Sequence, residues 1–317
     1  MCDRFATTMD SDGLTNHWLC TTPLNCEFGL LGNPDGRCAL NAAITSLLAL
    51  PPMRKAIADA DESGADGETF RFKVLQSLRS LAKRMRSGCG PYSCQALYDA
   101  CCEENLIEKG VDADASQLAH SLVETLADVR SPSSPTRGSN HFAGLWSVPG
   151  VTGSDRLAFF VVPVHEVPQD DGTVVAEVES GMEQGFPSGV AGALLGSTGL
   201  QCAASIITWT PELWGRASGV FFADEVELSG SRGVWRVSAV LVRCGEWDGG
   251  HFATVRRWTE KEQALAWQSC NDADGDRWVL LDDANMQVLP PLDGGALGEW
   301  DLWKTFRPVA LFWHRVS

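Results

Sequence analysis

The chain changes character near residue 130, and this change constrains the fold more than any single motif. Before it, apolar residues recur with the helical period, as in the segments 38–50, 69–86 and 114–128. After it, short β-branched and aromatic runs are separated by Gly and Asp clusters, a pattern typical of strands. Helices first and strands later predict an α+β fold with a cleft between the two halves.

Local signals set the expected boundaries. Pro51 and Pro52 are expected to stop the first helix, Pro91 to open another that runs through Tyr98, and Asp114 to lie near the N-terminal cap of a third. The segment 130–139 is rich in Pro and Ser and is expected to be a linker or exposed loop. The expected strands cover 157–164, 173–178, 205–210, 234–243, 251–258, 278–281 and 309–314.

Composition excludes several classes of protein. The net charge of −16 argues against a nucleic-acid partner, which would require a basic face. The apolar run 39–50 is too short and too polar to cross a bilayer, and the first residues lack the apolar stretch of a signal peptide. The eleven cysteines include no Cys-x-x-Cys pair, so no zinc site is expected. We therefore expect a soluble intracellular protein, in the cytoplasm or the nucleus, with free thiols and no membrane partner.

One cysteine lies where its chemistry would be unusual. Cys38 follows the turn cluster 33–36 and opens the first expected helix, where the positive end of the helix favours a thiolate. Asn33 lies five residues earlier, close enough along a tight turn to donate its amide to a developing oxyanion. The alternative is that Cys38 is a buried helix cysteine, as most of the eleven are expected to be.

A histidine and a carboxylate complete a candidate triad. His251 follows two glycines at the start of an expected strand, and Asp282 ends the next one, so strand pairing would bring the two side chains together. Taken singly, His251 could be an edge-strand residue, and Asp282 with Asp283 could form an ordinary turn.

Three segments together resemble the ubiquitin-specific proteases, which are papain-like deubiquitinases. Phe28-Gly-Leu-Leu-Gly-Asn33-Pro-Asp-Gly-Arg-Cys38-Ala-Leu-Asn41 is similar to the Cys box of that family, Gly-Leu-x-Asn-Leu-Gly-Asn-Thr-Cys-Tyr-x-Asn. Val237-Ser-Ala-Val-Leu-Val-Arg-Cys-Gly245 with Gly250-His251-Phe-Ala-Thr-Val resembles its His box, Ala-Val-x-x-His-x-Gly followed by Gly-His-Tyr. Trp278-Val-Leu-Leu-Asp282-Asp283 is similar to Trp-Tyr-x-Phe-Asp-Asp.

The resemblance implies a function and a set of roles. It implies cleavage after the C-terminal Gly of ubiquitin or a ubiquitin-like protein, without a cofactor or a catalytic metal. Cys38 would be the nucleophile, His251 its base, Asp282 the orienting acid and Asn33 an oxyanion donor, while Asp283 would support Asp282 or position a water.

The resemblance also implies a substrate channel and a domain layout. Gly249, Gly250, Trp247 and Phe252 would line the channel, and acidic side chains near the cleft would suit the basic tail of the family's substrate. Residues 1–27 would be an arm, and 28–317 a catalytic domain with a helical thumb (28–129), reduced fingers without structural zinc (140–205) and a β-rich palm (206–317). The oligomeric state is left open.

The segment from Pro34 to Arg37 departs from the family pattern next to the nucleophile. Ala39 and Phe252 likewise replace tyrosines. These departures leave open a second hypothesis, a catalytically weak ubiquitin-binding or scaffolding module. A third, a papain-like peptidase for ordinary peptides, is disfavoured by the order of the boxes along the whole chain.

Overall fold

The computed structural model carries both of the expected halves. The predicted arm 1–27, the predicted linker 130–139 and much of the predicted fingers region lie outside the residues that it describes, as do Trp247 and Gly249. The described residues are 30–33, 36–60, 70–86, 91–127, 141–146, 159–168, 174–178, 182–183, 186–187, 190, 206–212, 225–227, 234–245, 250–259, 262, 277–289 and 301–316.

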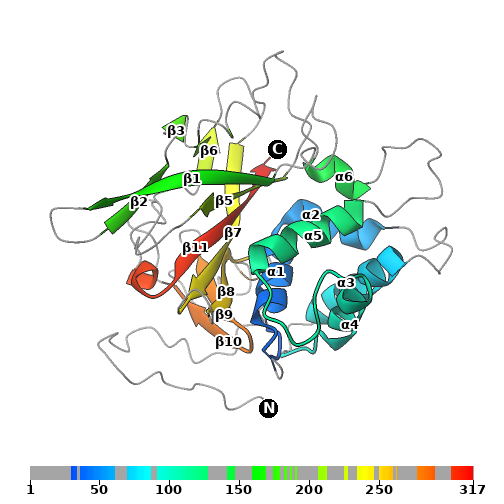
Figure 1. Cartoon of the computed structure of the whole chain (residues 1–317). Helices are drawn as coiled ribbons and strands as arrows, with labels where there is room; N and C mark the ends of the chain where they lie inside the picture. Colours follow the sequence, from blue (N-terminus) through cyan, green and yellow to red (C-terminus); the bar gives the residue numbers. More distant parts are fainter. Residues whose placement is uncertain are drawn as a thin grey trace.

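The helices gather on one side of the molecule (Figure 1). They are α1 (Cys38–Ala49), α2 (Pro51–Asp59), α3 (Phe70–Met85), α4 (Gln95–Glu103), α5 (Ala115–Ala127) and α6 (His141–Trp146). No helix in these described ranges is long and apolar enough to span a membrane.

The strands form a mixed sheet beside the helices, in the order β10-β9-β8-β7-β11-β5-β1-β2, with β6 paired to β7. Among the described residues, neighbouring strands of this sheet run antiparallel, except β1 and β5, which run parallel. The strands of this sheet are β1 (Phe159–Pro168), β2 (Val174–Val178), β5 (Ile206–Glu212), β6 (Glu225–Glu227), β7 (Val234–Cys244), β8 (His251–Arg257), β9 (Trp278–Asp282), β10 (Asn285–Val288) and β11 (Arg307–Val316). A short 3-10 helix, η3 (Asp301–Lys304), precedes β11. Strands β3 (Met182–Glu183) and β4 (Phe186–Pro187) pair with each other in a separate two-stranded sheet.

Helix α1 joins the two halves. It packs against α5 and against strands β7 and β8, and every residue from Ala39 to Leu48 is buried. Its buried polar side chains have partners: the Ser46 and Thr254 hydroxyls lie 3.1 Å apart, and Thr254 donates to the Ala42 carbonyl at 2.9 Å. Because a buried hydroxyl without a partner is costly, these bonds fix the register of α1 on β8.

The observed elements confirm most of the predicted ones and correct two boundaries. Pro51 and Pro52 do end α1, but they also begin α2 as its first two residues, where the missing N–H of proline is harmless. The prediction that Pro91 opens a helix is wrong, because Tyr92 forms an isolated bridge with Leu31 and α4 begins only at Gln95. Asp114 accepts backbone N–H bonds in the first turn of α5, as a cap does.

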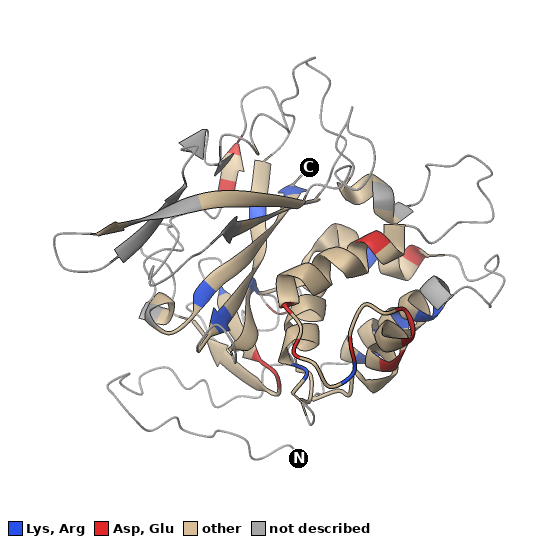
Figure 2. Ribbon diagram, in the orientation of Figure 1, with Lys and Arg blue, Asp and Glu red and all other residues tan. Residues whose placement is uncertain are grey.

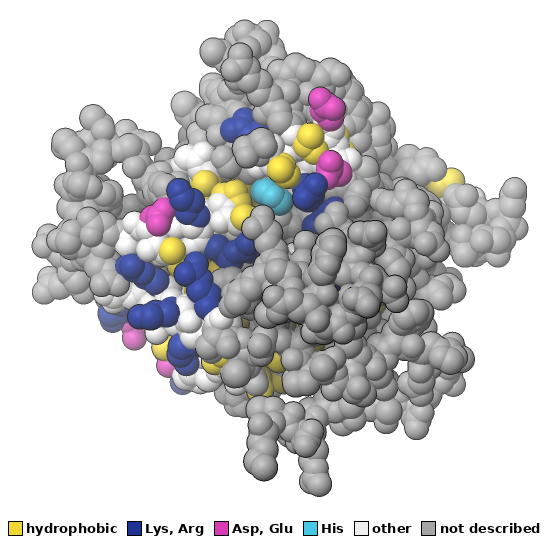
Figure 3. Space-filling view, turned by 180° about the vertical axis from the view of Figure 1, so that it is seen from behind, with side chains coloured by type: hydrophobic (Ala, Val, Ile, Leu, Met, Phe, Trp, Pro, Cys, Tyr) yellow, Lys and Arg dark blue, Asp and Glu magenta, His cyan; other side chains and the backbone are white. Residues whose placement is uncertain are grey.

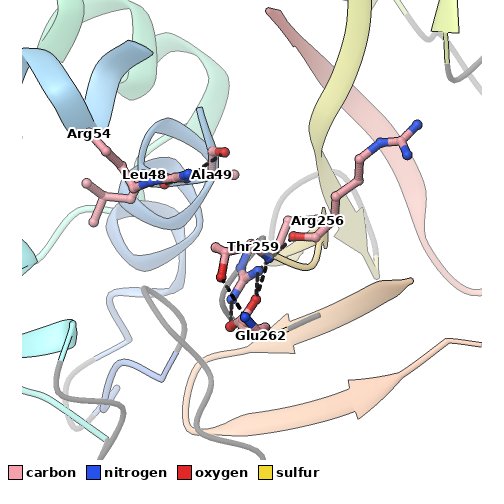
Figure 4. A network of polar contacts seen from close by, with 7 residues as sticks. Leu48, Ala49, Arg54, Arg256, Thr259 and Glu262 are labelled. Atoms are coloured by element: carbon pink, nitrogen blue, oxygen red, sulfur yellow. Dashed lines mark hydrogen bonds and ion pairs between the residues drawn. The ribbon is translucent and has the colours of Figure 1, made fainter. Parts of the chain in front are cut away.

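Two arginines, Arg54 and Arg256, make hydrogen bonds and an ion pair near α1 and beyond β8 (Figure 4). Arg54 donates to the Leu48 and Ala49 carbonyls at 2.8 and 2.9 Å and so satisfies the C-terminal end of α1. Beyond β8, Arg256 and Glu262 form a bidentate ion pair at 2.8 and 2.7 Å, with side chains only 1% and 4% exposed. An ion pair this buried holds its loop in one arrangement, since separating the charges inside the protein is expensive.

Charge is unevenly spread despite the acidic total. The range 70–86, which includes α3, contains six basic residues and no acidic one. Seen from behind, Lys and Arg side chains gather on the side where the helices lie (Figure 3). Several of these side chains serve the fold, because Arg79 donates to the Ala60 carbonyl at 2.9 Å and Lys73 pairs with Glu103 at 2.7 Å.

Candidate active site

Cys38 is the first residue of α1 and is partly exposed. The residue before it, Arg37, makes no side-chain hydrogen bond to the N-terminal end of the helix. The N-terminal end of a helix carries partial positive charge, which stabilises a thiolate. The location of Cys38 at this junction agrees with the position expected from the sequence.

The turn before Cys38 is closed by Asn33. The Asn33 Oδ1 accepts the backbone N–H of Arg37, and Gly36 takes a left-handed conformation with φ of +70°. The Arg37 side chain lies on α4, where it donates to Gln95 at 2.6 Å and stacks over the Tyr98 ring at 4.1 Å. The altered segment of the Cys box therefore directs its arginine onto α4.

His251 begins β8, and Asp282 ends the neighbouring strand β9. The antiparallel pairing of Thr254 with Leu281 brings the ends of these two strands together, and His251 Nε2 hydrogen-bonds Asp282 Oδ1. The two side chains are 35% and 25% exposed. Since Nε2 is occupied by Asp282, the other ring nitrogen is the one available to the Cys38 thiol.

The hydrogen bonds from His251 alter its protonation. The bond to Asp282, with a smaller contribution from the bond to Cys38, raises the pKa of His251 to about 11, although burial acts in the opposite direction. The imidazole is therefore protonated at neutral pH. A protonated imidazole beside a thiol is the partner that a thiolate requires.

Asp283 connects the two halves of the molecule at this point. Its Oδ2 accepts Asn33 Nδ2 at 2.7 Å, its Oδ1 accepts Asn41 Nδ2 at 2.7 Å, and its backbone carbonyl accepts the N–H of Leu31 at 3.1 Å. Its φ of 52° is left-handed, a conformation that Asp tolerates better than most residues. Burial raises the pKa of Asp283, while the two asparagine amides act to lower it.

The carboxylate of Asp283 also lies near the triad, with Oδ2 4.0 Å from His251 Nε2. The ligand atoms of His251, Asp282 and Asp283 lie within 4.8 Å of one another, close enough to hold a metal ion. The hydrogen bonds of Asp282 to His251, and of Asp283 to its two asparagines, account for this closeness without a metal.

The two described channel residues have packing roles. Phe252 is 6% exposed and lines a small pocket with Asn41, Ala42 and Thr45 of α1. A Cβ on Gly250 would lie 2.8 Å from Cζ and 2.9 Å from Nη2 of the Arg243 side chain, so glycine is required for that arginine to lie where it does. The predicted substrate contacts of Gly250 and Phe252, and of Gly249 and Trp247 outside the described residues, stay predictions.

Sequence reasoning missed Cys94 and Arg243 beside the triad, and it gave no partner for Asn41. Asn41 holds Asp283, and Cys94 donates its S–H to Asn41 Oδ1 at 3.2 Å. Burial raises the pKa of the Cys94 thiol. Arg243 lies against Gly250, next to His251. Asn41 had a signal in the sequence, since it matches the last asparagine of the Cys-box pattern, and Arg243 stands where the His-box pattern has a histidine.

Comparison with known proteins found a similar fold among solved structures but no similar sequence. No protein-family model and no curated protein matches the sequence. Among solved structures, a SAGA DUB module with Ubp8, Sgf11, Sus1 and Sgf73, bound to monoubiquitin, matches with a TM-score of 0.58 and 7% identity, over 94% of this chain and 73% of the other. The match is to Ubp8, a deubiquitinase of the ubiquitin-specific protease family. The chain has the catalytic-domain fold of Ubp8.

The α+β class predicted from the sequence is thereby confirmed, with helices N-terminal and an antiparallel-rich sheet C-terminal. At 7% identity, the likeness does not extend to activity or to individual residues.

Proposed function

We propose that this chain is a thiol-dependent hydrolase that cleaves the peptide or isopeptide bond after the C-terminal glycine of ubiquitin or a ubiquitin-like protein. The observation that carries the proposal is the pair of hydrogen bonds that joins His251 to Asp282 on one side and to Cys38, at the N-terminal end of α1, on the other. The fold of Ubp8 supports the same class of reaction, since the solved Ubp8 module is bound to monoubiquitin.

Three side chains have separate roles in the proposed mechanism. The Cys38 thiolate attacks the glycine carbonyl while His251 retains the proton taken from the thiol. His251 then gives that proton to the departing amine, and water activated by His251 hydrolyses the thioester. Asp282 keeps the imidazole in one tautomer and orientation throughout, and it stabilises the imidazolium.

Asn33 is the proposed oxyanion donor, together with the backbone N–H of Cys38. An asparagine amide has two N–H groups, and the bond from Nδ2 to Asp283 uses one of them. The second N–H can therefore bind the oxyanion, while Asp283 fixes the orientation of the amide. Losing one such donor typically costs about 3–4 kcal/mol of transition-state stabilisation.

The division into thumb, fingers and palm that is expected from the sequence is part of this proposal. The thumb corresponds to the helical half with Cys38 and the palm to the strands that carry His251 and Asp282. The Asp283 contacts to Asn33 and Asn41 then join thumb and palm directly behind the triad.

The test is hydrolysis of ubiquitin with a C-terminal fluorogenic amide, followed by SUMO and NEDD8 substrates of the same kind. Cys38→Ala is the active-site variant, and Cys102→Ala, a free and partly exposed cysteine on α4, is the matched control. We expect release by the wild type and by Cys102→Ala, and none by Cys38→Ala. Binding without release from any substrate would favour the second hypothesis, a catalytically weak ubiquitin-binding or scaffolding module.

A further inference from the structure

A buried thiol at the start of α4 contacts the asparagine that holds Asp283. Cys94 is the N-cap residue of α4 and is only 2% exposed. Its S–H donates to the Oδ1 atom of Asn41 at 3.2 Å. Asn41 lies on α1, three residues after the proposed nucleophile Cys38. The thiol of Cys94 is therefore one side chain away from the group that joins the two halves of the molecule behind the triad.

The partners of the Asn41 amide determine which way it points. Its Nδ2 donates to Asp283 Oδ1 at 2.7 Å and to the Gly32 carbonyl at 3.4 Å, while its Oδ1 accepts the S–H of Cys94. The two ends of an amide have nearly the same shape and differ in donor and acceptor character. Since Asn41 is 3% exposed, bulk water has little access to replace these partners. A donor on one side and a carboxylate on the other therefore favour a single orientation.

Cys94 is suited to donate this bond because it remains a protonated thiol at neutral pH. Burial raises the pKa of the Cys94 thiol, and this effect outweighs the nearby Arg37 guanidinium, which acts to lower it. A thiol can donate a weak hydrogen bond, whereas a thiolate can only accept one. A buried, protonated cysteine is also a poor nucleophile, so its environment fits a role in orientation rather than in attack.

Backbone contacts hold the segment before α4 close to the site. Tyr92 bonds through its backbone to the residues on either side of Leu31, accepting one N–H and donating to one carbonyl, both at 2.9 Å. Leu31 in turn donates its N–H to the Asp283 carbonyl at 3.1 Å. The acidic turn after β9 lies beside the N-terminal end of α1 (Figure 2). Because Cys94 is two residues from Tyr92, these bonds also fix the location of its thiol.

We propose that Cys94 is a positioning residue, whose S–H fixes the orientation of the Asn41 amide and so keeps Asp283 in place. Asp283 in turn orients the Asn33 amide, the proposed oxyanion donor. This inference rests on the proposed function and names a further residue on which the same site depends. Since Asn33 acts on the charge that develops during the reaction, a loss of its orientation affects the chemical step rather than substrate binding.

The test measures kcat and KM of Cys94→Ala and Cys94→Ser with the ubiquitin, SUMO or NEDD8 amide that the wild-type chain cleaves fastest. Alanine removes the donor, whereas the serine hydroxyl can donate to Asn41 in place of the thiol. We expect Cys94→Ala to lower kcat by roughly twofold to tenfold, as the loss of one neutral hydrogen bond predicts, with KM unchanged. Cys94→Ser should recover most of the lost kcat. All rates are measured below the melting transition of each variant.

Cys101→Ala is the matched control, because Cys101 is a second free cysteine of α4 and is 0% exposed. The substitution removes a buried sulfur of the same size from the same helix but keeps the bond from Cys94 to Asn41. It should leave kcat and KM unchanged even if it lowers the melting temperature. A fall in kcat that Cys94→Ser does not restore, or an equal fall in Cys101→Ala, would overturn the proposal.

A second measurement requires no turnover and so separates this inference from the proposed function. Thermal unfolding of Cys94→Ala, Asp283→Ala and the double variant forms a double-mutant cycle. If Asn41 connects the two residues, the double variant should lose less stability than the two single losses added together. Cys101→Ala combined with Asp283→Ala should be additive.

The two proposals can then fail separately. If the wild-type chain cleaves no modifier, the hydrolase proposal fails, and the double-mutant cycle alone decides whether Cys94 holds Asp283 through Asn41. Additive losses for Cys94→Ala and Asp283→Ala would overturn that connection. Cleavage with a kcat that Cys94→Ala leaves unchanged would keep the hydrolase and reject the positioning role of Cys94.

Discussion

The carboxylate of Asp283 should support both the fold and the reaction, and replacing it separates these two effects. It accepts bonds at 2.7 Å from the amides of Asn33 and Asn41, and its side chain is only 13% exposed. Asp283→Ala removes both bonds and leaves the Asn41 amide, on a residue 3% exposed, without that partner.

The size of the effect follows from opposing contributions. A hydrogen bond to a charged group contributes about 1.5–3 kcal/mol, so two of them amount to roughly 3–6 kcal/mol. Burial raises the pKa of Asp283, which means that the fold bears a cost for burying the charge, and alanine relieves that cost. We therefore expect a net loss of about 2–3 kcal/mol, which lowers the melting temperature by roughly 3–5 °C in a protein of this size.

The assay is thermal unfolding of Asp283→Ala beside Asp282→Ala. Asp282 is a neighbouring residue of the same type, but it is 25% exposed and bonds His251, so its loss should cost about 1 kcal/mol or less in stability while still abolishing activity. Asp283→Ala should also lower kcat, because Asn33 loses the bond that orients its amide. Equal melting temperatures for the two variants would refute the reasoning about the connection between the halves.

Three further predictions concern single contacts. The bond from Asp282 raises the pKa of His251 to about 11, so the stability it contributes is complete below about pH 6.5 and lost as the pH rises toward 11. Asp282→Asn should therefore be less stable than wild type at pH 7 in urea unfolding, with the gap narrowing by pH 10, and should lose roughly 10²–10⁴-fold in kcat. Glu262→Gln should lower the free energy of unfolding by about 3–5 kcal/mol, because it removes the negative charge that is paired with the buried Arg256. Glu262→Leu combined with Arg256→Met should cost far less, and equal losses for the two variants would contradict this. Gly36→Ala should cost about 1 kcal/mol in thermal unfolding, purely from its φ of +70°, since an added Cβ meets nothing within 4 Å, and no loss would argue against the left-handed turn.

Much of the fold was predictable because its elements bury one regular face. Helices α1, α3 and α5 and strands β7, β8 and β9 agree with their predicted spans to within a few residues, since each carries an apolar pattern of the right period. Helix α2 was missed because two prolines at its first turn look the same in sequence as a helix stop. Strand β10 was missed because it alternates between partly buried and exposed positions and depends on β9 for its pairing.

The candidate site was predictable only where local context marks a residue. Cys38, His251 and Asp282 each follow or end a recognisable element, so motif order identified them as candidates. The contact of Asn41 with Asp283 joins residues 242 positions apart, and the S–H bond of Cys94 also depends on tertiary packing. No local pattern can predict such contacts.

The most direct test of the proposed mechanism is covalent trapping of the nucleophile. Ubiquitin, SUMO and NEDD8 that end in a C-terminal alkyne electrophile would be incubated with the wild-type chain, and the adduct mapped by peptide mass spectrometry. We expect a single adduct with at least one of these modifiers, on Cys38, that disappears in Cys38→Ala and persists in Cys102→Ala. An adduct on another cysteine, or none with any of the three, would contradict the assignment of Cys38 as the nucleophile of a modifier-specific hydrolase.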